Sequence, residues 1–205
     1  MIGGTIARIA RLISGARAHW IEPPPADARQ RVYFANHSSH LDFVIIWSAL
    51  PPEIRARTRP VAGADYWNRG RIRRYLANRV FHAILIDRDG AAKSPEQASR
   101  SIDQIAAGMG DHNDIIVFPE GTRSPNGDVQ AFKSGLYHLC RMKPDLELVP
   151  VYLANMNRIL PKGEFLPVPL IGRVVFGAPI RVAPGEEKSA FLTRARDALL
   201  SLRDR

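Results

Sequence analysis

Residues 31–42 read RVYFANHSSHLD, a short apolar-rich run followed by polar side chains that open a second apolar run. The segment 31–35 has the length and composition of a buried strand, and residues 41–50 have those of a helix. A strand that leads into a helix through a short polar loop is the repeating unit of α/β folds. The stretch therefore predicts the fold class and a possible site on the connecting loop.

The same alternation continues along the rest of the chain. Further strand-like runs occur at 59–62, 80–87, 114–118, 147–153 and 171–176. Helical patterns occur at 64–78, 95–108, 134–142 and from about residue 186. This order favours an α/β architecture, a single layered domain with a mostly parallel sheet flanked by helices. The domain is expected to comprise residues 23–205, a length that suits one domain.

Residues 1–22 are predicted to form an amphipathic helix that lies in a membrane interface. Ile2, Ile6, Ile9 and Ile13 recur at helical spacing beside arginines, and prolines follow at 23–25. The alternative is a terminal helix packed on the protein's own core. No apolar run reaches the ~20 residues that a spanning helix needs. We therefore expect a peripheral protein on the cytoplasmic face of the membrane.

The charge of the chain narrows the class of partner, and its cysteine content shows whether an internal disulfide can form. The chain has 29 Lys and Arg against 20 Asp and Glu, a formal charge of +9, which favours an anionic partner such as anionic lipid or a phosphorylated substrate. The basic stretch WNRGRIRR at 67–74 lacks the interleaved aromatics of nucleic-acid readers, so no nucleic acid is expected. The single cysteine, Cys140, excludes an internal disulfide and is expected to be a buried, inert thiol.

The polar cluster after residue 35 contains a candidate general base. Ser39 and Asp42 fit a helix-capping pattern, which leaves His37 unexplained. On one continuous helix His37 and Asp42 would point about 140° apart, so they can meet only if His37 lies in the loop and Asp42 in the first turn. An imidazole held by a carboxylate can remove a proton from a hydroxyl. We predict that His37 is the base and Asp42 its partner.

Two other mechanisms are open for this cluster. His37, His40 and Asp42 could together bind zinc, although no second His or Cys cluster occurs downstream to complete the ligand set. Ser38 or Ser39 could be a nucleophile, but the G-x-S-x-G turn that exposes such a serine is absent. A base that needs no metal is the simpler interpretation.

A second polar loop, FPEGTRS at 118–124, follows the strand-like run 114–118. Sites in α/β folds gather at the carboxyl ends of strands, so this loop and the one after residue 35 are expected to share a pocket. Gly121 would let a ligand approach the backbone, and Arg123 could hold a phosphate by two parallel hydrogen bonds. Lys133 could add positive charge nearby. The alternative is a polar turn with a surface Glu–Arg pair.

Four ordered blocks resemble those of the glycerolipid acyltransferase family, in particular the 1-acylglycerol-3-phosphate acyltransferases. NHSSHLD at 36–42 looks like the first block, NHxSxxD, and residues 86–88 (IDR) look like the arginine-bearing second block. FPEGTRS matches the third block in full, and residues 149–151 (VPV) match the fourth. The second block departs from the family pattern, because the glycine and phenylalanine usual before its arginine are missing.

The resemblance implies that His37 and Asp42 are catalytic and that the acceptor's glycerol phosphate is bound by Arg88, Glu120, Gly121, Thr122 and Arg123. It implies acyl transfer from acyl-CoA or an acyl carrier protein thioester to a lysophospholipid, giving phosphatidic acid for phospholipid biosynthesis. No metal or bound cofactor is required. One alternative is acylation of another lysolipid, such as a lyso-ornithine lipid. The other is a non-catalytic binder of anionic membranes or nucleic acid that uses Arg69, Arg71, Arg73 and Arg74.

Overall fold

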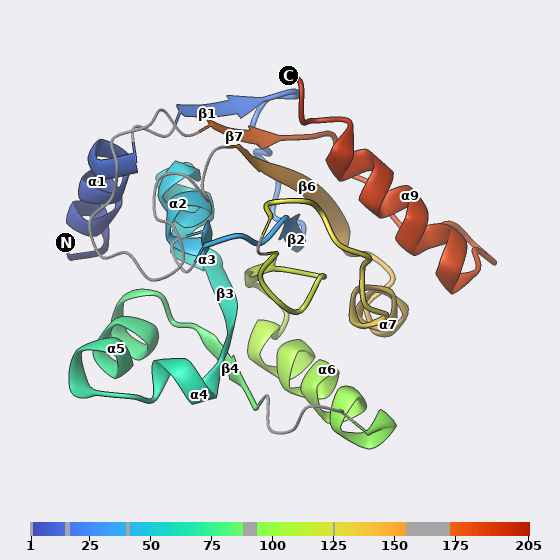
Figure 1. Cartoon of the computed structure of the whole chain (residues 1–205), viewed down its shortest axis with the longest axis horizontal. Coiled ribbons are helices and arrows are strands. Elements are labelled where there is room, and N and C mark those ends of the chain that lie inside the picture. The colour runs from blue at the N-terminus through green and yellow to red at the C-terminus, as the bar shows by residue number, and fades with distance from the viewer. Residues whose placement is uncertain (1, 15–16, 40–41, 88–93, 125, 155–172) are drawn as a thin grey trace.

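The computed structural model describes residues 2–14, 17–39, 42–87, 94–124, 126–154 and 173–205 (Figure 1). Within these residues seven strands form one sheet in the order β1-β7-β6-β2-β5-β3-β4. The strands are β1 Arg17–Trp20, β2 Arg31–Ala35, β3 Thr58–Gly63, β4 Ile84–Ile86, β5 Asp114–Val117, β6 Glu147–Ala154 and β7 Arg173–Phe176. Neighbouring strands are parallel except for β6 and β7. The predicted α/β fold with a mostly parallel sheet is confirmed.

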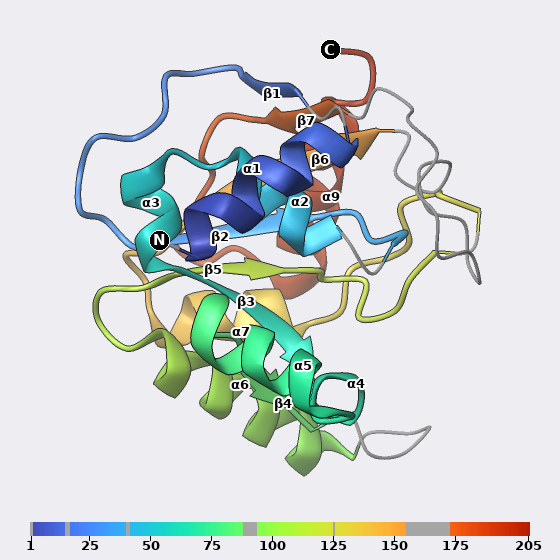
Figure 2. The same cartoon turned by 90° about the vertical axis from the view of Figure 1, so that its left-hand side faces the viewer.

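Helices cover both faces of the sheet (Figures 1 and 2). The described helices are α1 Ile2–Ser14, α2 Asp42–Ala49, α3 Pro52–Arg57, α4 Ala64–Trp67, α5 Arg71–Tyr75, the π-helix η1 Leu76–Val80, α6 Pro95–Met109, α7 Gly135–Met142 and α9 Lys188–Leu200. Helices α1, α2, α4 and α5 lie on one side, and α6, α7 and α9 lie on the other (Figure 1). Every helix within the described residues is too short or too polar to cross a bilayer.

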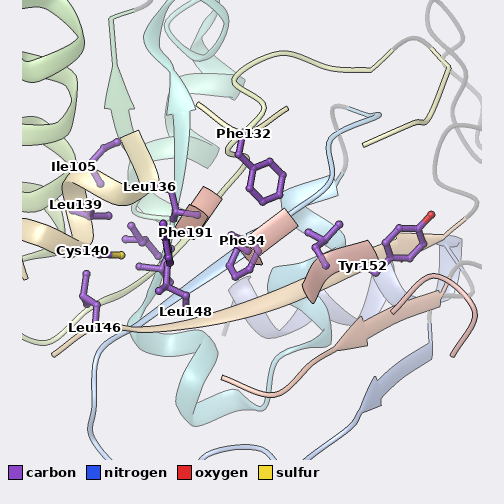
Figure 3. Close-up of a cluster of buried hydrophobic side chains, with 14 of the residues drawn as sticks. Phe34, Ile105, Phe132, Leu136, Leu139, Cys140, Leu146, Leu148, Tyr152 and Phe191 are labelled. Carbon is purple, nitrogen blue, oxygen red and sulfur yellow. The ribbon is translucent and has the colours of Figure 1, made fainter. Parts of the chain in front are cut away.

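Each face of the sheet has its own apolar core. On one face Phe34 and Leu148 of the sheet meet Ile105, Leu139 and Phe191 from the three covering helices (Figure 3). The opposite core contains residues of the sheet, α1, α2 and the segment after η1, among them Ala7, Tyr33, Trp47, Phe81 and Phe176. Burial on both faces explains why β2 and β5 are apolar throughout after their charged first residues, Arg31 and Asp114.

The prediction of one helix over residues 1–22 is wrong in its extent. Helix α1 ends at Ser14, and Arg17–Trp20 form the edge strand β1, which pairs with β7. Trp20 stacks on Phe176 with 3.9 Å between ring centroids, so a tertiary contact holds this strand. The predicted domain boundary at residue 22 therefore divides the sheet from one of its own strands.

Helix α1 packs against α2 through its small residues. Ala7 is fully buried, and a Cβ on Gly3 would come within 3.3 Å of the Trp47 ring. Ile6 is partly buried against the same core, whereas Ile9 is 49% exposed. The side chains of Ile2 and Ile13 lie outside the described part. The alternative of a helix packed on the core thus holds for one side of α1, and the other side keeps an apolar residue at the surface.

The region 64–87 also differs from its prediction. The helices expected near 64–78 are α4, α5 and η1, whereas the expected strand 80–87 is limited to Ile84–Ile86. Gly70 has φ +91°, a conformation that separates α4 from α5 and that favours glycine. Val80 and Phe81 pack against the core on the α2 side instead of joining the sheet. A short apolar run does not by itself show whether its residues join the sheet or pack against it.

Buried charges lie at the amino ends of the central strands. Asp114 is fully buried, accepts the Arg31 backbone N–H at 2.8 Å and lies 3.2 Å from the Arg57 guanidinium. Burial raises the pKa of Asp114 from 3.8 to about 6, although the two arginines oppose this. Arg31 pairs with Glu147 at 2.8 Å. These pairs connect β2, β5 and β6 at the end of the sheet opposite the polar loops.

Candidate functional site

The two polar loops meet at the carboxyl edge of the sheet, as predicted. β2 and β5 are adjacent and parallel, with Phe34 beside Val117, so the segments that follow them leave the sheet together. The Ser124 backbone N–H donates to the His37 carbonyl at 2.7 Å, which joins the two loops directly.

His37 and Asp42 form the predicted pair. His37 lies in the loop after β2, and Asp42 is the first residue of α2. The His37 Nδ1 atom is 2.9 Å from Asp42 Oδ2, which also accepts the backbone N–H groups of Ser38 and Ser39 at 2.7 and 2.8 Å. Because this oxygen serves as an acceptor for two amides, the arrangement favours a proton on Nδ1. The Nε2 lone pair is then free to accept a proton from a substrate.

The plane of the imidazole is fixed by a stacked ring as well as by the hydrogen bond of Nδ1. The rings of His37 and Phe118 stack with 4.1 Å between centroids and 19° between planes. The His37 side chain keeps 14% of its surface exposed, whereas the Asp42 side chain is fully buried. The imidazole is therefore oriented by residues of both loops and still reaches solvent. Sequence reasoning missed the role of Phe118, whose only signal is its place at the start of FPEGTRS.

Glu120 accepts hydrogen bonds from two backbone segments of the site. Its Oε1 accepts the His37 backbone N–H at 2.8 Å, and its Oε2 accepts the Gln130 backbone N–H at 2.9 Å. The residue is only 3% exposed, and burial raises its pKa, against the opposing effect of the two amides. Both oxygens are thus occupied inside the protein. The contact between Glu120 and the acceptor stays a prediction, since the carboxylate as placed braces the His37 loop.

Asn36 fixes the point at which the His37 loop leaves the sheet. Its side-chain amide donates to the Leu153 carbonyl at 3.0 Å and its side-chain oxygen accepts the Leu153 N–H at 2.8 Å. These bonds extend the pairing of β2 with β6 beyond Ala35 and Val151. Asn36 is 4% exposed, so water does not compete strongly for its amide.

Two cations stand at the turn after Glu120. Gly121 has φ +72°, and a Cβ there would come within 2.7 Å of Lys133 Nζ, so the lysine side chain lies across the glycine backbone. Thr122 and Arg123 are exposed, and Arg123 has no ion pair among the described residues. The prediction that Lys133 lies near this loop is confirmed. The turn, which is joined to the His37 loop through Ser124, therefore carries two positive charges.

Comparison with known proteins decides the family. A family model described as Acyltransferase matches residues 19–154, more than half of the chain. The chain belongs to the acyltransferase family. All four sequence blocks lie within the matched region.

Curated relatives carry one recurrent name. The 1-acyl-sn-glycerol-3-phosphate acyltransferase of Limnanthes alba is 30% identical over 149 residues, which cover 69% of this chain and 48% of the relative. The protein of that name from Salmonella typhimurium is 27% identical over 65% of this chain and 51% of its own. The human alpha form is 27% identical over 83% and 58%. The chain thus spans about half the length of the curated relatives it matches.

A solved structure shares the fold of this chain. The crystal structure of the 1-acyl-sn-glycerophosphate acyltransferase from Thermotoga maritima superposes with a TM-score of 0.72 at 18% sequence identity. The superposition covers 98% of this chain and 77% of the other. At this identity the likeness shows the common architecture.

The remaining predicted residues are not among those described in this cluster. His40, which the zinc hypothesis requires, and Arg88, a predicted phosphate contact, lie outside the described residues. Within the described part no group of three His, Cys, Asp or Glu side chains could hold a metal ion. Cys140, on the buried side of α7, packs into the core (Figure 3). Burial raises the pKa of its thiol to about 12, so it is an inert core residue as predicted.

Proposed function

We propose that this acyltransferase moves a fatty acyl chain from a thioester donor to the free hydroxyl of 1-acylglycerol-3-phosphate, forming phosphatidic acid. The observation that carries the proposal is the His37–Asp42 pair, held at 2.9 Å beside a turn with two cations. The names of the curated relatives support the choice of acceptor. Acyl-CoA and an acyl carrier protein thioester are both suitable donors.

The reaction requires one base and close positioning. Nε2 of His37 accepts the proton of the acceptor hydroxyl while the hydroxyl oxygen attacks the thioester carbonyl. A C–O bond forms, the C–S bond then breaks, and the departing thiolate receives the proton from His37. Asp42 stabilises the imidazolium and keeps Nδ1 protonated throughout. Thioesters are reactive enough that a positioned base is a sufficient catalyst.

The exposed cations give the site its preference for a phosphate. The planar guanidinium of Arg123 can donate two parallel hydrogen bonds to a phosphate monoester, and the Lys133 ammonium adds a point charge. Arg88 is proposed to contribute to the same contact. The phosphate would then anchor the acceptor with its hydroxyl near Nε2.

We further propose that the enzyme is peripheral, at the cytoplasmic face of an anionic membrane, with α1 in the interface. The exposed residues Arg8 and Ile9 of α1 form the surface available for this contact. Deleting α1 would uncover the α2 surface on which Ala7 packs, so Ile9→Ser is the cleaner test. Vesicle binding of that variant should be weaker than that of the wild type, with no loss of fold.

The proposal is tested by acyl transfer with purified protein. Lysophosphatidic acid, lysophosphatidylcholine and a lyso-ornithine lipid are offered as acceptors, each with acyl-CoA and with an acyl carrier protein thioester. We expect the highest kcat/KM with lysophosphatidic acid and no transfer by His37→Ala. Activity confined to another lysolipid would disprove the acceptor. Activity that survives His37→Ala would disprove the mechanism.

A further inference from the structure

Helix α5 exposes two large apolar side chains. Ile72 is 77% exposed and Tyr75 is 48% exposed, and the three-residue spacing places them on the same side of a helical turn. Among the described residues only two other large apolar side chains are exposed to this degree, Ile9 and Met142. Since burying an isoleucine is favourable, such a pair on a short helix calls for a partner.

The same segment is strongly basic. Residues 64–80 contain five arginines and a single acidic residue, Asp65. None of these arginines makes an ion pair within the described part of the chain. Arg73 lies over the Tyr66 ring at 4.3 Å and Arg74 donates to the Asn68 carbonyl, contacts that leave their charge uncompensated. The arginines are Arg69, Arg71, Arg73, Arg74 and Arg79.

Helix α5 lies at the same end of the sheet as the site and is anchored by packed residues on both sides of it. Trp67 and Leu76, on either side of α5, pack against the core that contains Phe43 and Phe81. Helix α4 follows β3 at the carboxyl edge of the sheet, the edge at which His37 lies. Helices α5 and α1 occupy the same side of the molecule, facing the viewer in Figure 2.

We infer that α5 is a second membrane-docking surface, formed by Ile72 and Tyr75 with the surrounding arginines, and that its partner is a bilayer containing anionic lipids. The apolar pair would enter the interface while the guanidinium groups contact lipid phosphates. Of the exposed pair only Tyr75 has a ring that could stack on a base, whereas binders of single-stranded nucleic acid stack successive bases on several aromatic side chains, which disfavours nucleic acid. A two-fold contact with a second copy would bring the arginines against one another. The inference does not depend on the acyl-transfer reaction.

Vesicle binding by matched variants tests this surface. Arg71→Gln/Ile72→Ser removes one exposed charge and one exposed apolar side chain from α5. The control, Arg141→Gln/Met142→Ser, likewise removes one exposed arginine and one exposed apolar side chain, from α7 on the other face. Each protein is sedimented with phosphatidylcholine vesicles with and without phosphatidylglycerol, and its melting temperature confirms the fold. Wild type should bind the anionic vesicles preferentially.

We expect the α5 variant to bind anionic vesicles about tenfold more weakly or worse, since one arginine at such a surface is worth about fivefold and the isoleucine adds to this. The α7 control should bind like the wild type. Equal binding by both variants, or no preference for anionic vesicles, would overturn the inference. So would a wild-type dimer in light scattering that the α5 variant lacks, or tighter binding to single-stranded RNA than to vesicles. Transfer to water-soluble short-chain acceptors should be unchanged in both variants.

Discussion

Replacing Glu120 with glutamine keeps the size of the side chain and removes one acceptor from a buried site. In the wild type the two carboxylate oxygens accept the backbone N–H groups of His37 and Gln130 at 2.8 and 2.9 Å. A glutamine has one oxygen and one NH₂ group, so its NH₂ must face one of these donors. One buried N–H loses its partner whichever way the amide turns.

The cost follows from the bond that is lost. A hydrogen bond to a charged group contributes about 1.5–3 kcal/mol. The neutral amide recovers part of this, because it avoids the cost of burying a charge, the same cost that raises the pKa of Glu120. We expect the free energy of unfolding to fall by about 2 kcal/mol. For a chain of this length that corresponds to a melting temperature lower by about 4–8 °C. The kcat should fall as well, because the lost bond holds the backbone of His37.

Urea unfolding followed by tryptophan fluorescence measures the stability, and steady-state acyl transfer measures kcat and KM. Glu53→Gln, at an exposed position of α3, is the control and should change the stability by less than about 0.5 kcal/mol. If Glu120 instead contacts the acceptor, as the family resemblance implies, its variant would unfold like the control and show a raised KM. That result would refute the bracing role.

His37→Ala should abolish transfer with little change in melting temperature, because the backbone N–H that Glu120 accepts is retained; a large loss of stability would indicate a structural role instead. Arg123→Ala should lower kcat/KM for lysophosphatidic acid about ten- to over a hundredfold, equivalent to about 1.5–3 kcal/mol, with partial recovery in Arg123→Lys. An equal loss with lysophosphatidylcholine, whose phosphate is a diester, would contradict the proposed contact between Arg123 and a phosphate monoester. Burial raises the pKa of Asp114 from 3.8 to about 6, so the folded protein binds this proton more tightly than the unfolded chain. Relative to Asp114→Asn, the wild type should therefore lose stability as the pH rises from about 4 to about 6, by up to about 3 kcal/mol, and a difference that is independent of pH would contradict this.

The strands and the pairing of His37 with Asp42 were predictable because their signals are local. A buried strand between two helix-covered faces is apolar on both faces, as residues 32–35 and 115–117 are. Two such strands that run parallel bring their following loops to one edge. The five-residue separation of His37 and Asp42 required a break before the helix, and the helix does begin at Asp42.

Other features depend on partners distant in the sequence. Residues 17–20 are too few and too exposed to show a strand pattern, and they become β1 because β7, more than a hundred residues later, offers a free edge and Phe176 a ring for Trp20. Glu120 is an acid in a turn until Gln130 and His37 approach it from two directions. Composition and periodicity thus determined the layers of this protein and the pairing of His37 with Asp42. Tertiary structure alone decided which backbone groups meet the buried carboxylate, since such contacts form only when separate segments pack together.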